Sequence, residues 1–513
     1  MAIKLSGLVS GMDTESMVQE LMKAQSTKKV KLQNKITTTE WKQEKWKTLN
    51  SKIYSFYKDT LAKLKLQSSF NTKSATTTNE SKVGVTASTT APEGTHTIQV
   101  KQLATAQYAT GTQLGKDLNG NTISSGTKLT DLGMVAGEGN VIKINAGGKE
   151  TSVTISDTTT VGDVVTTLKN AGLNASYDAS QKRFFISSKA GGAANAFTIE
   201  TEGTVDLSKL GLGTITKSGD TVSTSSGMTL VQPSDAKIIY NGVEMSSTTN
   251  NISVNGLTIT LKAVTNGANT ADTSDDEVIN INIKKDTQAV YDMVKDFVKK
   301  YNELLKEMNE NYDAVSARGY DPLTDEEKEA MSEDQIEKWE TKIKDSLLRR
   351  DNGLGSLINN MRSSFSGSVK VGDKSYSLAS FGIGSANYTE KGTLHIDGDQ
   401  DDSLTSANVN KLMNAINDDP DTVMKVMNQL ADNLYSSLTD SMKSTTLRSA
   451  LTLYNDKEMT KSIKNYKEDL TKLESKLADM ESRYYKQFSA METAMAKMNS
   501  QSSALASMLG TNV

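Results

Sequence analysis

The stretch that decides the fold is residues 463–509, which read IKNYKEDLTKLESKLADMESRYYKQFSAMETAMAKMNSQSSALASML. Apolar residues recur here after three or four positions almost throughout, a spacing that places one narrow stripe along a helix. Such a stripe is buried only when a second helix packs against it. The sequence therefore predicts a helical arm that needs a partner. The stripe consists of Ile463, Tyr466, Leu470, Leu473, Leu477, Met480, Tyr484, Phe488, Met491, Met495, Met498, Leu505 and Leu509.

The predicted partner is a helix at the opposite end of the chain, in residues 15–66. We expect Asp13 or Thr14 to cap its N-terminus, because both side chains accept hydrogen bonds from free backbone N–H groups. Its seam is interrupted by polar residues such as Gln25 and Gln43, so packing against a partner must supply most of its stability. The apolar seam positions are Val18, Leu21, Leu32, Ile36, Trp46, Leu49, Ile53, Phe56 and Leu64.

The composition changes after Phe70. Residues 71–286 are rich in Thr, Ser, Gly, Asn and Val, with short runs of period two, which indicates strands. Asn241-Gly242 and Asn255-Gly256 each separate two such runs and predict tight hairpins. A third hairpin is predicted around Gly147-Gly148, and residues 161–173 have the spacing of a short amphipathic helix.

Helical spacing returns after Asp286, so the β-rich region is inserted between two helical segments. We therefore predict a multidomain α+β protein, with long coiled-coil-like helical legs from both termini and a nested β-rich head of two small domains. The predicted parts are terminal helical arms (1–42 and 456–513), a helical leg domain with a small β part (43–72 and 286–455), a β-rich head domain (73–112 and 233–285) and an inserted β-rich head domain (113–232).

Composition argues against several classes of protein. Hydrophobic residues make up 36% of the chain and the net charge is −4, which does not favour a nucleic-acid partner. There is no cysteine, and two histidines are too few for a histidine-based metal site. The first residues lack the apolar core of a secretory signal, and no run of about 20 apolar residues could span a bilayer. We expect no cleaved signal and no membrane insertion.

Residues 1–65 carry 13 lysines against 6 acidic residues. One interpretation is a solvated lysine face on a long helix. The alternative is that this face meets an acidic surface on a partner.

No catalytic or cofactor site is predicted. Asp397, Asp399 and Asp401 resemble the start of a calcium loop, but Asp402 stands where that loop requires glycine and Asn408 where it requires glutamate. A solvated acidic turn is the better interpretation. The methionines after residue 480 could line a pocket, although packing explains them more simply. We therefore expect no enzyme, no cofactor and no metal.

Several motifs resemble the flagellar hook-associated protein 2 family, the filament-capping proteins of bacterial flagella. Their order and spacing along the chain carry the resemblance. The motifs are LSGLVSGMDTESMVQELM at 5–22, GTHTIQVKQLA at 94–104, FVKKYNEL at 297–304, PLTDEEKEAMS at 322–332, LRRD at 348–351, FGI at 381–383, GTLHID at 392–397, DPDTV at 419–423 and RYYKQF at 483–488.

The resemblance implies a ring of subunits at the distal tip of the filament, outside the cell, that retains exported flagellin and promotes its folding and insertion. It also implies contacts with hook–filament junction proteins, an export chaperone, and export by the flagellar secretion apparatus without a cleaved signal. A hook–filament junction protein, or a surface adhesin acting in cell adhesion through the β-rich head, remain alternatives.

Residues of the helical seam are the candidate assembly site. We expect Leu5 to Met12 to become ordered only against a partner, and the rest of the seam to bind one. The candidate residues are Leu5, Leu8, Val9, Met12, Val18, Leu21, Leu32, Ile36, Leu470, Leu473, Leu477, Met480, Tyr484, Phe488, Met491 and Met495.

Overall fold

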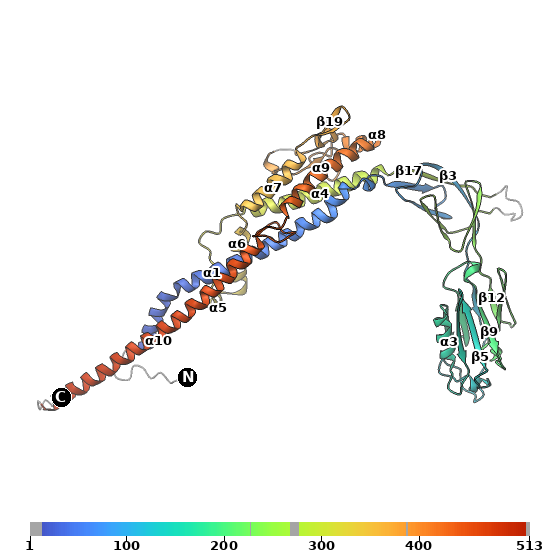
Figure 1. The fold of residues 1–513 in the computed structure, drawn as a ribbon, viewed down its shortest axis with the longest axis horizontal. Coiled ribbons are helices and arrows are strands. Elements are labelled where there is room, and N and C mark those ends of the chain that lie inside the picture. The colour runs from blue at the N-terminus through green and yellow to red at the C-terminus, as the bar shows by residue number, and fades with distance from the viewer. Residues whose placement is uncertain (1–12, 226, 267–275, 386–387, 509–513) are drawn as a thin grey trace. The chain divides into compact units, whose positions relative to one another are not determined.

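The computed structural model describes residues 13–225, 227–266, 276–385 and 388–508. The chain forms two compact units (Figure 1). One combines Met1–Phe70 with Thr287–Val513 and is mainly helical, and the other comprises Asn71–Asp286 and is mainly β. This arrangement confirms the predicted α+β class with a β-rich region inserted between two helical segments.

The helical unit contains two very long helices at the ends of the chain. The first, α1, is extended by a π-helical turn at Phe56–Leu61 and by α2. The helices are α1 (Thr14–Ser55), α2 (Ala62–Lys65), α4 (Thr287–Tyr312), α5 (Asp325–Glu329), α6 (Glu333–Ser346), α7 (Asn352–Phe365), α8 (Lys411–Asp418), α9 (Pro420–Ser441) and α10 (Asp456–Met508). The small strands of this unit are β18 (Val369–Val371), β19 (Lys374–Tyr376), β20 (Ile383–Gly384) and β21 (His395–Ile396).

The core of the helical unit is built where the second half of α1 meets α4, α7, α8 and α9. Phe297 of α4 lies at its centre, with its ring centroid 5.9 Å from that of Phe56 and 5.4 Å from that of Phe365. Trp46 of α1 stacks on Tyr454, just before α10, at 5.7 Å. The first half of α1 and all of α10 take no part in this core.

In its described residues, the β unit contains four main sheets and one α-helix, α3 (Val161–Asn170). The strand orders are β1-β17-β3-β13-β14, β11-β10-β9-β5-β6, β12-β4-β8-β7 and β15-β16-β2. The strands are β1 (Lys73–Thr77), β2 (Val83–Ala87), β3 (Gly94–Gln102), β4 (Tyr108–Thr110), β5 (Val141–Ala146), β6 (Lys149–Thr154), β7 (Asn174–Asp178), β8 (Arg183–Ser187), β9 (Phe197–Glu202), β10 (Ile215–Ser218), β11 (Thr221–Thr224), β12 (Thr229–Val231), β13 (Ala236–Tyr240), β14 (Val243–Ser247), β15 (Asn251–Val254), β16 (Leu257–Leu261) and β17 (Ile279–Lys285).

Two separate hydrophobic clusters stabilise the β unit. One gathers buried residues between Ala109 and Met228 and includes the apolar face of α3. The other gathers buried residues of 83–104 and 236–283. The predicted residue boundaries of the four parts stay a prediction, although two cores in this unit are what two small domains would need.

The predicted hairpins are confirmed. Asn241 and Gly242 adopt φ values of +48° and +83° between β13 and β14. Asn255 and Gly256 adopt +49° and +76° between β15 and β16. Two successive positive φ angles are those of a type I′ turn, which Asn-Gly favours because neither residue is strongly strained there.

Candidate assembly interface

Helices α1 and α10 pair in antiparallel orientation, a direction that the sequence left open. Side-chain contacts between them follow one another in reverse order along the two helices. They are Tyr485 Oη to Glu15 Oε1 at 2.9 Å, Lys29 Nζ to Glu474 Oε1 at 3.0 Å, Lys467 Nζ to Glu40 Oε1 at 2.8 Å, and Gln43 Nε2 to Thr460 Oγ1 at 3.0 Å. The two ends of the chain therefore lie side by side along most of α1 (Figure 1).

On α1, the predicted seam residues differ in burial. Val18 and Ile36 are buried and Leu32 is half-buried, whereas Leu21 is 41% exposed. The next residue, Met22, is half-buried instead. Met22, four residues after Val18, keeps the stripe on the side of α1 that faces α10. Leu21, three residues after Val18, turns its side chain toward solvent.

On α10, the stripe is half-covered from Ile463 to Phe488 and becomes more exposed beyond it. The predicted residues Leu470, Leu473, Leu477, Met480, Tyr484, Phe488 and Met495 are half-buried, and Met491 is 38% exposed. No described side chain between 456 and 507 is fully buried. The stripe is thus only partly satisfied by α1. The candidate residues Leu5, Leu8, Val9 and Met12 lie outside the described residues.

The last part of α10 extends past the described start of α1 (Figure 1). Glu15 contacts Tyr485, so the helix continues for about six turns beyond this contact, to Met508. Met498 and Leu505 on this extension are 68% and 59% exposed. The extension therefore presents apolar side chains that no described residue covers.

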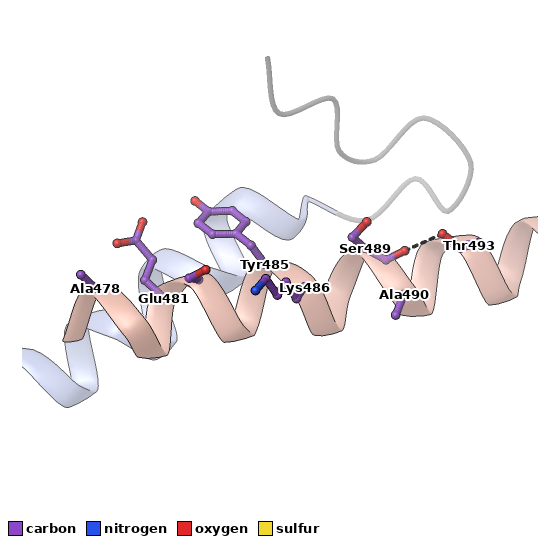
Figure 2. A pocket seen from close by; sticks show the side chains of 8 residues that line it. Ala478, Glu481, Tyr485, Lys486, Ser489, Ala490 and Thr493 are labelled. Carbon is purple, nitrogen blue, oxygen red and sulfur yellow. Dashed lines mark hydrogen bonds between the residues drawn. The ribbon is translucent and has the colours of Figure 1, made fainter. Parts of the chain in front are cut away.

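A hollow of about 620 Å³ lies on α10 at the level where α1 begins (Figure 2). The Tyr485 ring points toward α1 in Figure 2, and its hydroxyl donates to Glu15. Burial and this carboxylate raise the pKa of Tyr485 to about 12, so the hydroxyl stays protonated as a donor. Glu481 and Lys486 line part of the rest, and the remainder is lined by small side chains, among them Ala478, Ser482 and Ser489. They leave room for another helix to approach closely.

Sequence reasoning missed the polar contacts between the two arms. Lys29 and Glu40 on α1 face Glu474 and Lys467 on α10, so opposite charges alternate along the seam. This is the arrangement that sets orientation in coiled coils. Reading the charges beside both stripes together would have favoured the antiparallel orientation.

The acidic turn that resembles a calcium loop is bound by lysines. Lys295 of α4 contacts Asp399 and lies 2.7 Å from Asp401, and Lys411 lies 3.2 Å from Asp397. The hydrogen bonds that Lys295 donates to Asp399 and Asp401 raise the pKa of its ammonium group despite its partial burial. The described residues contain no group of three or more His, Cys, Asp or Glu side chains arranged to hold a metal ion. An ammonium group lies where the loop motif suggested a cation.

His395 links two carboxylates next to this turn. Its Nδ1 lies 2.5 Å from Asp402 and its Nε2 lies 2.8 Å from Glu390. Burial lowers the pKa of His395, but the hydrogen bonds to Asp402 and Glu390 outweigh it and leave the pKa raised. The group links β21 to Glu390 and Asp402 on its two sides.

Among the described helices, none combines the length and the apolarity needed to cross a bilayer.

Sequence comparison identifies relatives along almost the whole chain. Residues 10–107 match the N-terminal family of flagellar hook-associated protein 2, and residues 233–500, more than half of the chain, match its C-terminal family. The flagellar hook-associated protein 2 of Halalkalibacterium halodurans is 26% identical, covering 98% of this chain and 99% of that protein. The Escherichia coli K12 protein of the same name is 24% identical, covering 100% and 99%.

Structural comparison agrees at the level of the fold. The crystal structure of the D1-D2-D3 domains of the flagellar cap protein FliD from Escherichia coli superposes with a TM-score of 0.52 at 20% identity, covering 82% of this chain and 99% of that one. The resemblance seen in the motifs is confirmed, and the chain belongs to the flagellar hook-associated protein 2 family.

Proposed function

We propose that the chain caps the distal tip of a flagellar filament, where it forms a ring that retains exported flagellin and promotes its folding and insertion. The observation that carries this proposal is the half-covered stripe of α10. Helix α10 has 53 residues, and none of its described side chains is fully buried. Its apolar surface is therefore available to other molecules. The family membership and the names of the relatives support the same function.

The seam residues are proposed to bind the filament end and neighbouring copies. A cap must hold tightly and still move each time a subunit is added. Half-buried contacts suit this requirement, because part of the contact energy is spent on ordering the arms when they bind. Met-rich surfaces such as Met491, Met495 and Met498 can also repack against more than one partner.

The proposed partners are flagellin, the hook–filament junction proteins and other copies of the chain, with a flagellar export chaperone before secretion. Export would use the flagellar secretion apparatus, without a cleaved signal, and would place the protein outside the cell. The role is mechanical, and no catalytic step is proposed.

A location experiment tests this function. The turn at Gly147-Gly148 is exposed between β5 and β6 and accepts a short epitope tag far from the arms in sequence. Gold-labelled antibody should mark the distal tip of filaments on cells carrying the tagged chain. Label at the hook–filament junction would favour the alternative junction role and contradict the proposal.

A second arm of the experiment measures flagellin. Cells that lack the chain should release unpolymerised flagellin into the medium and carry short filaments or none. Restoring the chain should return flagellin to filaments. If flagellin is assembled normally without the chain, the capping function is wrong, and binding of the isolated β unit (residues 71–286) to host glycans or mucus would then test the adhesin alternative.

A further inference from the structure

A stripe of lysines on α1 faces away from α10. Lys28, Lys31, Lys35, Lys42 and Lys45 are spaced so that they lie on one side of the helix. The contacts to α10 come from a different side, at residues such as Lys29, Glu40 and Gln43. Lysines on such a stripe are available to a molecule that approaches α1 from outside the arm pair.

The second half of this stripe already binds carboxylates of the same chain. Lys42 Nζ lies 2.8 Å from Asp351 and Lys45 Nζ lies 3.5 Å from Asp345. The first half has the same spacing but is unoccupied. Lys28, Lys31 and Lys35 are exposed and make no ion pair with a described residue.

The α5–α6 segment carries the complementary charge. Asp334 of this segment pairs with Lys338 and Asp345 pairs with Lys45, but five other exposed carboxylates make no ion pair with a described residue. Ile343 is the one buried residue in α5 and α6. These carboxylates are Asp325, Glu326, Glu329, Glu333 and Glu337.

Polar contacts, and not a hydrophobic core, hold this acidic segment in shape. Glu340 binds Lys328 and Lys344, each at 2.9 Å, and burial of Glu340 is outweighed by these lysines, so its pKa is lowered. Trp339 packs on Tyr320 with ring centroids 4.5 Å apart. Capping boxes begin both helices, at Thr324 and at Ser332. The segment is a defined shape that presents unpaired negative charge to solvent.

We propose that the acidic α5–α6 segment of one copy docks on the Lys28–Lys31–Lys35 face of a neighbouring copy. The two surfaces are different patches of the same chain, so the contact is heterologous and repeats around a closed ring or along an open array. Complementary charges would steer the copies and set their register. This inference rests on the proposed function in requiring that copies assemble, and it assigns the surfaces through which they do so.

Charge reversal with mixing tests the proposal. The first variant, K28E/K31E/K35E, and the second, E329K/E333K/E337K, each place like charges in every contact between identical copies. Each variant alone should weaken self-association of the purified full chain at least about tenfold. Like charges that face each other across an interface cost more free energy than a tenfold change in affinity represents. Mass photometry or sedimentation velocity at low and high salt measures this.

The mixture decides between a contact within one chain and a contact between copies. When the two variants are mixed, each interface of an alternating assembly joins opposite charges, so association should return to the wild-type level. A chain carrying all six substitutions should also associate. Recovery in that chain but not in the mixture would mean that the charges pair within a copy, and the proposal would be overturned.

A matched control keeps net charge from explaining the result. K116E/K128E/K189E makes the same change in charge on exposed head lysines and should leave association unchanged. The proposal is also overturned if either three-residue charge-reversal variant associates like the wild type, or if the wild-type chain does not self-associate. It is overturned as well if association is restored neither in the mixture nor in the chain with all six substitutions. This assay uses no filaments, so its failure is distinguishable from mislocation of the tagged chain, which would overturn the capping function.

Discussion

Helices α4 and α10 have the same three-and-four spacing of apolar residues, but they bury them to different extents. In α4, nine side chains are buried, among them Val294, Phe297 and Leu305. In α10, which is twice as long, no described side chain is fully buried. The difference lies in the number of neighbours, because α4 packs among several helices whereas α10 has α1 as its partner in the described chain.

This comparison separates a helix that is buried in a core from a helix whose apolar stripe is only partly covered. Fully burying a Leu or Phe side chain contributes about 1.5–3 kcal/mol, and a half-covered one contributes roughly half of that. The stripe of α10 thus leaves apolar surface uncovered, and this is the surface proposed to bind a second partner. Substitutions in α4 should act mainly on folding, and those in α10 mainly on assembly.

The largest effect on stability is expected for Phe297→Ala. The Phe297 side chain is 1% exposed and packs against Phe56, Tyr301 and Phe365. Removing a buried phenyl group and leaving a cavity costs about 3–5 kcal/mol. Denaturant unfolding, followed by tryptophan fluorescence, should show this loss, since all three tryptophans lie in the helical unit. A loss below 1 kcal/mol would show that this core repacks easily and would weaken the contrast with α10.

A smaller effect on stability, with a complete loss of function, is expected for Leu473→Asp. In the isolated chain the cost should be about 1 kcal/mol, since this side chain is already half-exposed. Filament growth should stop, because a carboxylate would then face the apolar surface of a partner. Leu477→Asp should have the same effects on stability and on filament growth. Electron microscopy of cells carrying each variant measures filament length.

A variant of an exposed residue on the same helix serves as the control for the seam. Ser475→Asp adds the same charge next to Leu473 but on the side where the chain is exposed. It should support filaments of normal length. Full-length filaments with Leu473→Asp would remove α10 from the assembly site.

The elements and the pairing of α10 with the N-terminal helix could be predicted from the sequence, whereas the orientation of that pair and its individual contacts could not. Asn241-Gly242 and Asn255-Gly256 specify their turns through their own backbone preferences, and α10 is predicted by its own periodicity. The antiparallel orientation depends on pairs such as Lys29 with Glu474, which are far apart in the chain. The acidic turn was expected to be solvated, because the residue that binds Asp399 and Asp401, Lys295, lies on a helix about 100 residues away in the sequence.

The seam was predicted only in part, because its buried side depends on where the partner helix lies. Val18 and Ile36 were placed correctly on the buried side, whereas Leu21, also assigned to the seam, is 41% exposed and Met22 is half-buried in its place. Only the position of α10 decides between two adjacent apolar residues. Whether the seam residues bind other molecules stays a prediction.

Hydrogen exchange would sharpen the contrast between arm and leg. In a dilute isolated subunit, amides of α10 after about residue 460 and of α1 before about residue 40 should exchange much faster than those of α4, because partly covered helices open locally at low cost. Strong protection of both arms in a monomer would mean that α1 and α10 form a stable pair alone, and folding on binding would be wrong.

A smaller change is expected when the histidine link beside α4 is titrated. The folded pKa of His395 is raised above its unfolded value of about 6.5. Its contribution to stability is therefore fully present below that unfolded value and is lost as the pH rises through the folded pKa. Unfolding of the wild type and of His395→Gln, measured across this window, should show a pH-dependent difference that disappears at higher pH. A pH-independent difference would show that the link acts without its charge.

The smallest effect is expected for the ion pair between the arms. Lys29 and Glu474 are 35% and 45% exposed, and pairs this exposed contribute about 0.2–1 kcal/mol. A double-mutant cycle of Lys29→Ala and Glu474→Ala should give a coupling energy in this range that falls as salt is added. The main role of this ion pair is then to set the orientation of the two helices, because charges beside a seam select the antiparallel register more than they stabilise the pair. A charge swap, Lys29→Glu with Glu474→Lys, should preserve filament growth, while either reversal alone should slow it. If both single reversals leave growth unchanged, the apolar stripe alone specifies how the arms pair.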